Sequence, residues 1–255
     1  MIKLFCYWRI PLIFATYFRQ HIMRRFLYIF LSAICFLSCT KGYRIKGTSN
    51  ISNIDGKTIH VMTFDGDKWI SLDSCEVLHG QFRMNGTIDT TLITTLFIDG
   101  QPIMPMILEP GKIDITISDI KFKVTGTELN DSLYSFIFHK HKLDLRAAEL
   151  ERLESQMIMN GYAYDIIEQH VDSVYQELNN SMQKLVCNFI GNNYENALGL
   201  CGFSMLCNGL PYPIITPLIQ TVINDAPESF LEHPSIKKFI RIAHENAERY
   251  GVAHF

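Results

Sequence analysis

The side chains that could act as nucleophiles or metal ligands are the cysteines and histidines, and their spacing decides what chemistry they could support. Four of the seven cysteines lie beyond residue 40, at Cys75, Cys187, Cys201 and Cys207. These four contain no CxxC pair and no zinc-ligand spacing. Cys201 and Cys207 would be about 9 Å apart along an unbroken helix, too far for a disulfide bond. We therefore expect all four thiols to occupy core positions.

The other candidate sites also favour structural roles. His139 and His141 are two residues apart, so on a helix they point in different directions, whereas ligand pairs need a spacing of three or four. The segment Asp65-Gly66-Asp67 lacks the remaining oxygens of a calcium loop and predicts a turn. Phosphate-binding glycine loops and a Gly-x-Ser-x-Gly elbow are absent from the sequence. The sequence therefore predicts no catalytic, cofactor-binding or metal-binding residue, and the chain is expected not to be an enzyme.

Cys39 is the cysteine with a specific expected role. Arg24 and Arg25 precede the apolar run 26–37, which is shorter than the roughly 20 residues needed to span a bilayer. The run ends in Phe-Leu-Ser-Cys39, which resembles a bacterial lipobox. We expect residues 1–39 to be a leader with a lipoprotein signal peptide, in which Cys39 becomes lipid-modified and, after cleavage, forms the mature N-terminus. A plain signal peptide, or a buried apolar helix with an accidental cysteine, is the alternative.

Residues 1–22 stand before this signal, which is already complete from Met23 onward. True initiation at Met23 is the favoured interpretation, and an extended positively charged region is the other. The net charge of −3 and pI near 6.3 give no electrostatic footprint for nucleic acid. Hydrophobic residues at 47% and charged residues at 19% are typical of a globular protein.

The segment 43–127 has the pattern of a β-rich domain. About eight short runs with period-two alternation or β-branched residues are separated by Gly, Asp and Asn turns. Pro105 interrupts one run and suits an edge strand or a bulge. Without a long helix between the runs, an antiparallel sandwich or barrel is expected. The runs are residues 43–47, 58–64, 69–78, 81–85, 92–98, 104–108, 112–117 and 121–125.

Six short motifs follow one another along this segment and into the start of the next in a characteristic order. They are Asp73-Ser74, Gly80-Gln-Phe82, Gly86, Leu108-Glu-Pro-Gly111, Val124-Thr-Gly-Thr127 and Leu129-Asn130-Asp131. Their order and spacing over residues 43–136 resemble the domain-of-unknown-function 4369 (DUF4369) family.

The resemblance implies a β-rich module of exported proteins of Bacteroidetes-type bacteria, often placed before a thioredoxin-like domain of the thiol-disulfide interchange and peroxiredoxin type. The family offers no catalytic residues to carry over. Physically, Gly80, Gly86 and Gly111 are expected to supply turn geometry, and Phe82 is expected to point into the core.

The segment 128–255 is predicted to be helical, which makes the fold class α+β. Thr127 or Asn130 could cap the first helix, and apolar side chains, Leu153 among them, follow at spacings of three and four. The first two helices are expected to form an antiparallel hairpin. The predicted helices are residues 130–160, 164–190, 196–206, 214–224 and one beginning at Pro234.

These features favour a non-enzymatic lipoprotein of the cell envelope that acts as a binding or scaffold module. It would be held to a membrane through Cys39, would bind an unidentified envelope protein and would need no cofactor. The residues after Cys39 lack an acidic cluster, so the periplasmic side is expected. The alternative is a truncated or accessory part of an envelope thiol-disulfide oxidoreductase. In that case the Trp-Cys-x-x-Cys motif of a thioredoxin-like domain would lie outside this sequence.

Overall fold

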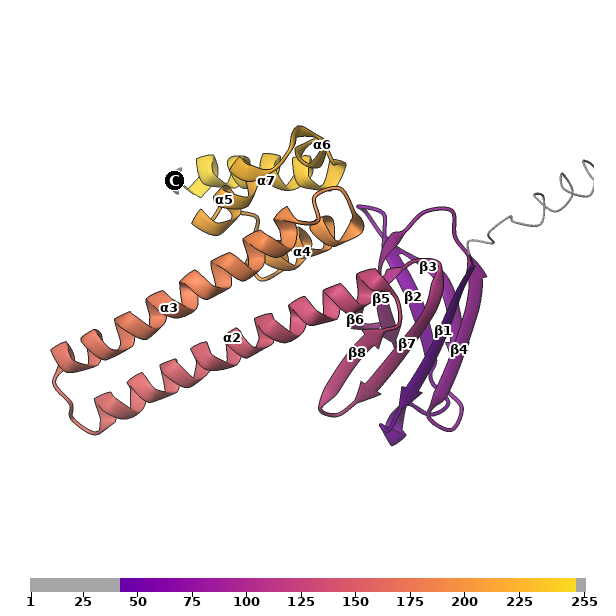
Figure 1. Ribbon diagram of the computed structural model, residues 1–255, viewed down its shortest axis with the longest axis horizontal. Helices are drawn as coiled ribbons and strands as arrows, with labels where there is room; N and C mark the ends of the chain where they lie inside the picture. Colours follow the sequence, from indigo (N-terminus) through magenta and orange to yellow (C-terminus); the bar gives the residue numbers. More distant parts are fainter. Residues whose placement is uncertain (1–41, 251–255) are drawn as a thin grey trace, which may run out of the picture. The chain divides into compact units, whose positions relative to one another are not determined.

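The computed structural model describes residues 42–250, where eight strands are followed by helices (Figure 1). The strands are β1 Gly42–Ser49, β2 Thr58–Phe64, β3 Trp69–Glu76, β4 Gln81–Thr87, β5 Leu92–Ile98, β6 Gln101–Leu108, β7 Gly111–Ser118 and β8 Lys121–Thr125. They form two four-stranded sheets with the orders β4-β1-β7-β8 and β3-β2-β5-β6. The predicted α+β class, with about eight N-terminal strands before the helices, is confirmed.

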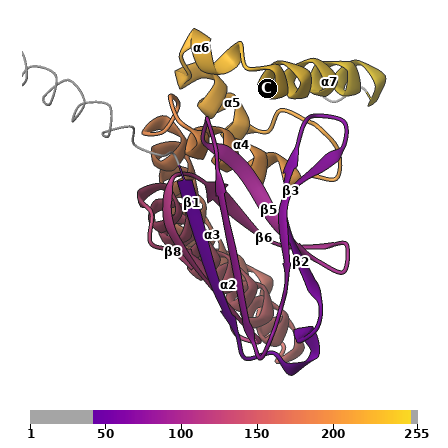
Figure 2. The same ribbon diagram turned by 90° about the vertical axis from the view of Figure 1, so that its right-hand side faces the viewer.

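The two sheets contribute to one hydrophobic core and form a sandwich (Figure 2). Along β1 and β7 the buried side chains alternate with exposed ones, because successive residues of a strand point to opposite faces. Ile45 and Ile113 from the first sheet and Leu96 from the second are fully buried in this core. Phe82 also lies in it, as predicted.

The sheets are antiparallel except at one strand pair. β1 and β7 run parallel, with Ile45 beside Ile113. A parallel pair needs a long crossover connection, which is usually a helix. Here the crossover consists of the five strands β2–β6, so the lack of an intervening helix did not exclude a parallel pair.

β6 lies at the edge of its sheet, as Pro105 predicted. Pro102 and Pro105 both lack an N–H group, which an edge strand tolerates because one side of it makes no ladder bonds. The register of the β5–β6 pair shifts between Leu96 and Phe97.

The helices follow close to their predicted positions, and the last begins with Pro234 at its first position as expected. The short helix α6 was not predicted. None of the helices within residues 42–250 is long and apolar enough to cross a membrane. The helices are α2 Glu128–Met159, α3 Tyr164–Gly191, α4 Ala197–Asn208, α5 Pro217–Asp225, α6 Glu228–Leu231 and α7 Pro234–Tyr250.

The predicted hairpin is formed by α2 and α3, which lie side by side (Figure 1). With 32 residues, α2 is about 48 Å long. Leu150 of α2 and Ile167 and Leu178 of α3 are buried. The expectation that Leu153 belongs to the buried stripe is wrong: its side chain is 38% exposed, because the less exposed stripe of α2 passes through Leu150, Glu154 and Met157 and leaves Leu153 beside it.

A second hydrophobic core joins the later helices to the base of the hairpin. Phe136 of α2 and Phe189 of α3 stack with their ring centroids 4.0 Å apart. Buried side chains of the later helices, such as Phe203 and Phe230, pack in the same cluster. Helix α4 also contributes Leu198 to the sandwich core, so it contacts both cores.

Candidate functional site

A buried asparagine joins the sandwich to the first helix. Asn130, fully buried, lies in the first turn of α2 beside the edge strand β6. Its Oδ1 accepts a hydrogen bond from Ile107 N at 2.9 Å, and its Nδ2 donates to Ile107 O at 2.7 Å. Nδ2 also donates to Thr127 Oγ1 at 2.8 Å. The asparagine amide thus pairs with the outer edge of β6 as the peptide of another strand would.

Two carboxylate side chains hold the start of α2, one from before the helix in the sequence and one from within it. Glu109 Oε1 accepts a hydrogen bond from Leu129 N at 3.1 Å, and Asp131 Oδ1 accepts one from Gly126 N at 3.3 Å. A carboxylate at a helix N-terminus satisfies a free N–H and interacts favourably with the helix dipole. Thr127 is the N-cap residue, but its side chain makes no capping bond, and Asn130 is not a cap. Glu109 does the capping.

Gly126 shows why this junction requires a residue without a side chain. Its φ is +96°, and an added Cβ would lie 2.5 Å from the carbonyl oxygen of Lys112. Three of the motifs noted in the sequence, around Glu109, Gly126 and Asn130, therefore meet at one place in the fold. Their role there is to fix where α2 leaves the sandwich.

A second cluster of motif residues links the two sheets. Tyr43 on β1 donates a hydrogen bond from its hydroxyl to Asp73 Oδ2 on β3 at 2.7 Å. Burial, together with the neighbouring Asp73 carboxylate, raises the pKa of Tyr43 to about 12. Gly86 on β4 pairs with Tyr43, and a Cβ added there would lie 2.5–2.7 Å from the tyrosine ring and hydroxyl.

The prediction that Gly86 supplies turn geometry is therefore wrong. It lies within a strand at an ordinary negative φ, and its missing side chain makes room for the Tyr43 ring. Gly80 and Gly111 do have positive φ, at +68° and +138°, as turn residues often do.

The four cysteines of the described residues are free thiols in or against the hydrophobic cores, as predicted. Cys201 is buried, and Cys75, Cys187 and Cys207 are half-buried. Burial raises the pKa of all four, to about 12 at Cys201 and Cys207. A reactive cysteine needs the opposite shift, because the thiolate is the nucleophile. Cys39 lies outside the described residues.

The two histidines lie on a helix and Asp65 lies in a turn, as predicted. His139 and His141 are both exposed on α2, and His139 Nδ1 donates to the carbonyl oxygen of Ser135 at 2.7 Å. Asp65 Oδ1 accepts from the backbone N–H groups of Asp67 and Lys68 at 3.0 and 2.9 Å. Asp65 is therefore occupied by the β2–β3 turn.

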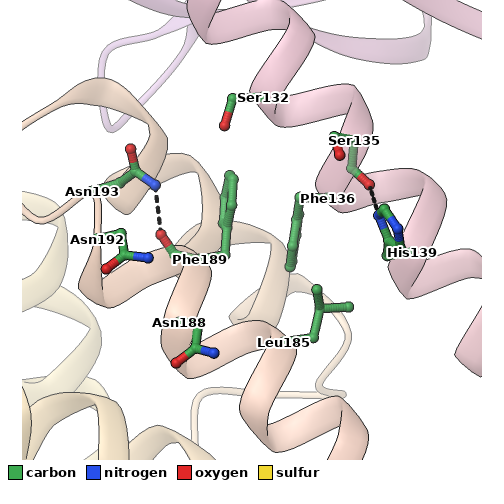
Figure 3. A pocket seen from close by; sticks show the side chains of 9 residues that line it. All are labelled: Ser132, Ser135, Phe136, His139, Leu185, Asn188, Phe189, Asn192 and Asn193. Atoms are coloured by element: carbon green, nitrogen blue, oxygen red, sulfur yellow. Dashed lines mark hydrogen bonds between the residues drawn. The ribbon is translucent and has the colours of Figure 1, made fainter.

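A groove of about 420 Å³ lies between α2 and α3 close to the sandwich (Figure 3). The ring faces of Phe136 and Phe189 stack on each other in it, and Ser135 and His139 stand at one side. The His139 ring bonds to the Ser135 carbonyl and not to its hydroxyl, so this pair is not a nucleophile and its base. The groove is lined by Ser132, Ser135, Phe136, His139, Leu185, Asn188, Phe189, Asn192 and Asn193.

Two further contacts were not predicted from the sequence. Ser71 Oγ and His60 Nδ1 lie 3.5 Å apart on neighbouring strands, at the outer limit of a hydrogen bond. Lys238 of α7 donates to the carbonyl oxygen of Gly66 at 3.0 Å and so ties the last helix to the β2–β3 turn. Both contacts depend on strand register and helix docking, which no local motif encodes.

Comparison with known proteins gives one match. The model of a family described as a domain of unknown function, DUF4369, matches residues 43–133. No curated protein and no solved structure matches the chain. The matched residues span the sandwich and the start of α2, so they include the buried asparagine and its partners. Residues 43–133 of this chain are therefore similar to the DUF4369 family, as the motifs in the sequence predicted.

Proposed function

We propose that this chain is a non-enzymatic binding or scaffold module of a bacterial cell envelope. The proposal rests on the structural role that the family's motif residues have in this fold. Glu109, Asn130 and Asp131 are polar side chains of the kind that catalysis uses, yet each is hydrogen-bonded to backbone groups at the junction of sheet and helix. What these residues do is position a long helical hairpin.

A hairpin fixed at its base is suited to presenting a surface to another molecule. The bonds to Ile107 and Leu129 hold the first turn of α2, and the Phe136–Phe189 stack fixes α3 against it. Binding costs less when the binding element is already ordered, because less conformational entropy is lost. The sandwich would then serve as the base and the hairpin as the part that meets a partner.

The envelope location rests on Cys39 and on the family. A lipid on Cys39 would stand three residues before Gly42, the first residue of β1, a reach of about 10 Å for an extended chain. The resemblance to exported proteins of Bacteroidetes-type bacteria supports the same location. The absence of an acidic cluster directly after Cys39 favours the periplasmic side.

The oxidoreductase alternative would need its reactive thiols from a thioredoxin-like domain outside this sequence. Within residues 42–250, burial raises the pKa of every cysteine, so none is poised as a thiolate near neutral pH. An insulin-reduction assay of the full chain should therefore show no turnover. Sustained reduction of insulin would overturn the non-enzymatic part of the proposal.

Metabolic labelling with a fatty-acid analogue in cells that produce the full chain tests the anchor. We expect the wild type to be labelled and Cys39→Ala to lose the label. Cys35→Ala is the matched control, because it removes a cysteine four residues earlier in the same leader and should keep the label. An unlabelled wild type, or a label retained in Cys39→Ala, would refute the lipid anchor.

A further inference from the structure

The turn between α2 and α3 concentrates exposed apolar surface. Five large hydrophobic side chains within the nine residues 158–166 are between 52% and 78% exposed. Figure 1 shows this turn at the end of the hairpin opposite the sandwich. Single exposed apolar residues are ordinary, but a contiguous group of them marks an interaction surface. We call this group the hairpin tip; it consists of Ile158, Met159, Tyr162, Tyr164 and Ile166.

The geometry of the turn accounts for only part of the hairpin tip. Gly161 N bonds to Ile158 O at 3.1 Å and Tyr162 N to Met157 O at 3.2 Å, with Gly161 at φ +75°. This is the Schellman arrangement that ends a helix, in which the residue after the glycine often contacts the residue five before it. The arrangement explains Gly161 and Tyr162. It does not need exposed isoleucine, methionine or a second tyrosine beside it.

The charges around the hairpin tip are almost all negative. Residues 149–172 carry six acidic side chains and one basic side chain, Arg152. Five of the acidic residues are exposed and Glu154 is half-buried. The acidic residues are Glu149, Glu151, Glu154, Asp165, Glu168 and Asp172.

The negative charge around the hairpin tip indicates which kind of molecule could bind its apolar surface. An anionic membrane would repel the acidic surround, and insertion at a membrane surface favours Lys and Arg beside the apolar side chains. A second copy of the tip would bring two acidic surfaces together. A protein surface with an apolar pocket and a rim of Lys and Arg would be complementary in both respects.

We propose that the hairpin tip is a docking surface for a partner protein that has an apolar pocket rimmed by basic residues. This inference rests on the proposed function and names the kind of partner. Tyr162 and Tyr164 would be the anchors, because tyrosine buries a large apolar area at low entropy cost and is enriched at binding hot spots. The acidic side chains would guide association and exclude partners with an acidic rim.

Photo-crosslinking of the full chain in its own cells tests the proposal. p-Benzoylphenylalanine in place of Tyr164 keeps an aromatic group on the hairpin tip, and the same probe in place of Phe122 on β8, which is 44% exposed, is the control position. We expect a discrete protein adduct from position 164 and none of the same mass from position 122. Mass spectrometry should place the crosslink in a segment of the partner that has apolar residues flanked by Lys or Arg.

A charge reversal makes the result specific. Glu154→Lys combined with Glu168→Lys should lower the adduct yield about tenfold through repulsion of the basic rim. Glu195→Lys with Glu228→Lys makes the same change in net charge at two exposed positions away from the tip and should leave the yield unchanged. Glu154, Glu168 and Glu228 lie in helices, where lysine and glutamate have similar propensities, and Glu195 lies in an exposed turn. Circular dichroism should therefore show both variants folded.

Several outcomes would overturn the inference: an adduct only with lipid, an adduct with a second copy of the chain, no adduct at position 164, or a yield insensitive to the charge reversal. Failure of the inference is distinguishable from failure of the proposed function. A labelled Cys39, inactivity toward insulin and a protein adduct from position 122 would leave the binding module standing with another surface. An unlabelled Cys39 or sustained insulin reduction would refute the proposed function whatever position 164 contacts.

Discussion

Replacing Asn130 by alanine tests whether this residue joins the sandwich to the hairpin. The change removes three hydrogen bonds, two of them to Ile107, whose side chain is buried on the edge strand β6. The N–H and C=O groups of Ile107 would be left without these partners beside α2. Each unpaired buried group costs about 1–3 kcal/mol, so we expect a loss of about 2–6 kcal/mol in the free energy of unfolding. That is a large part of the about 5–15 kcal/mol typical of a folded domain.

Urea unfolding followed by two probes measures the effect. In a Trp8→Phe background the fluorescence of Trp69 reports on β3, and far-ultraviolet circular dichroism reports mainly on the helices. We expect the two transitions of Asn130→Ala to separate, because the variant weakens the connection between sheet and hairpin. Asn180→Ala, an exposed asparagine on α3, is the control and should change stability by no more than about 0.5 kcal/mol.

Asn130→Asp provides a second, pH-dependent measurement. A carboxylate keeps the acceptor for Ile107 N but places negative charge against Ile107 O, and burial raises the pKa of such a carboxyl group. The protonated form can again donate a hydrogen bond, so the deficit relative to wild type should shrink as the pH falls. The reasoning would be refuted if Asn130→Ala cost less than about 1 kcal/mol, or no more than Asn180→Ala.

Three further predictions concern the core. Gly86→Ala should destabilise the chain by about 1–3 kcal/mol, because the added Cβ would overlap the Tyr43 ring. In the same urea experiment Gly209→Ala should leave the stability unchanged, because that position has space for a Cβ, and equal effects of the two changes would contradict the close contact. Cys201 and Cys207 should resist alkylation at pH 8 in the folded chain and react after denaturation, as followed by peptide mass spectrometry; rapid labelling of folded Cys201 would be inconsistent with its burial. The pKa of Tyr43 is raised from 10.0 to about 12, so its stabilising contribution is complete below pH 10 and is lost as the pH rises through 12. Tyr43→Phe should flatten the decline in unfolding free energy over that pH range. An unchanged slope would count against the raised pKa of Tyr43.

The contrast between Gly80 and Gly86 shows where reasoning from local pattern fails. Both are glycines of the family's motifs, and both were expected to turn the chain. Gly80 does so, because its neighbours in sequence already mark a break between two strands. Gly86 is the second-last residue of a paired strand, where the need for glycine comes from the ring of Tyr43, 43 residues earlier in the chain. No local pattern contains that information.

Asn130 shows the same limit for polar residues. From the sequence it is one of two residues that could cap a helix, because asparagine is favoured there. In the fold it pairs with the edge of β6, a strand that the helix contacts only after the chain has passed through β7 and β8. The expected lipid site at Cys39 stays a prediction, since it lies outside the described residues.

The sequence by itself determined the eight strands of this protein, its helices other than α6, their order and the structural character of its thiols. Period-two and period-3.6 patterns reflect which face of an element is buried, and this can be read from neighbouring residues alone. Only the tertiary structure decided that β1 pairs in parallel with β7, that Asn130 completes an edge strand and that the hairpin tip is exposed. Each of these depends on residues that are distant in sequence meeting, or failing to meet, when the sandwich and the helices pack.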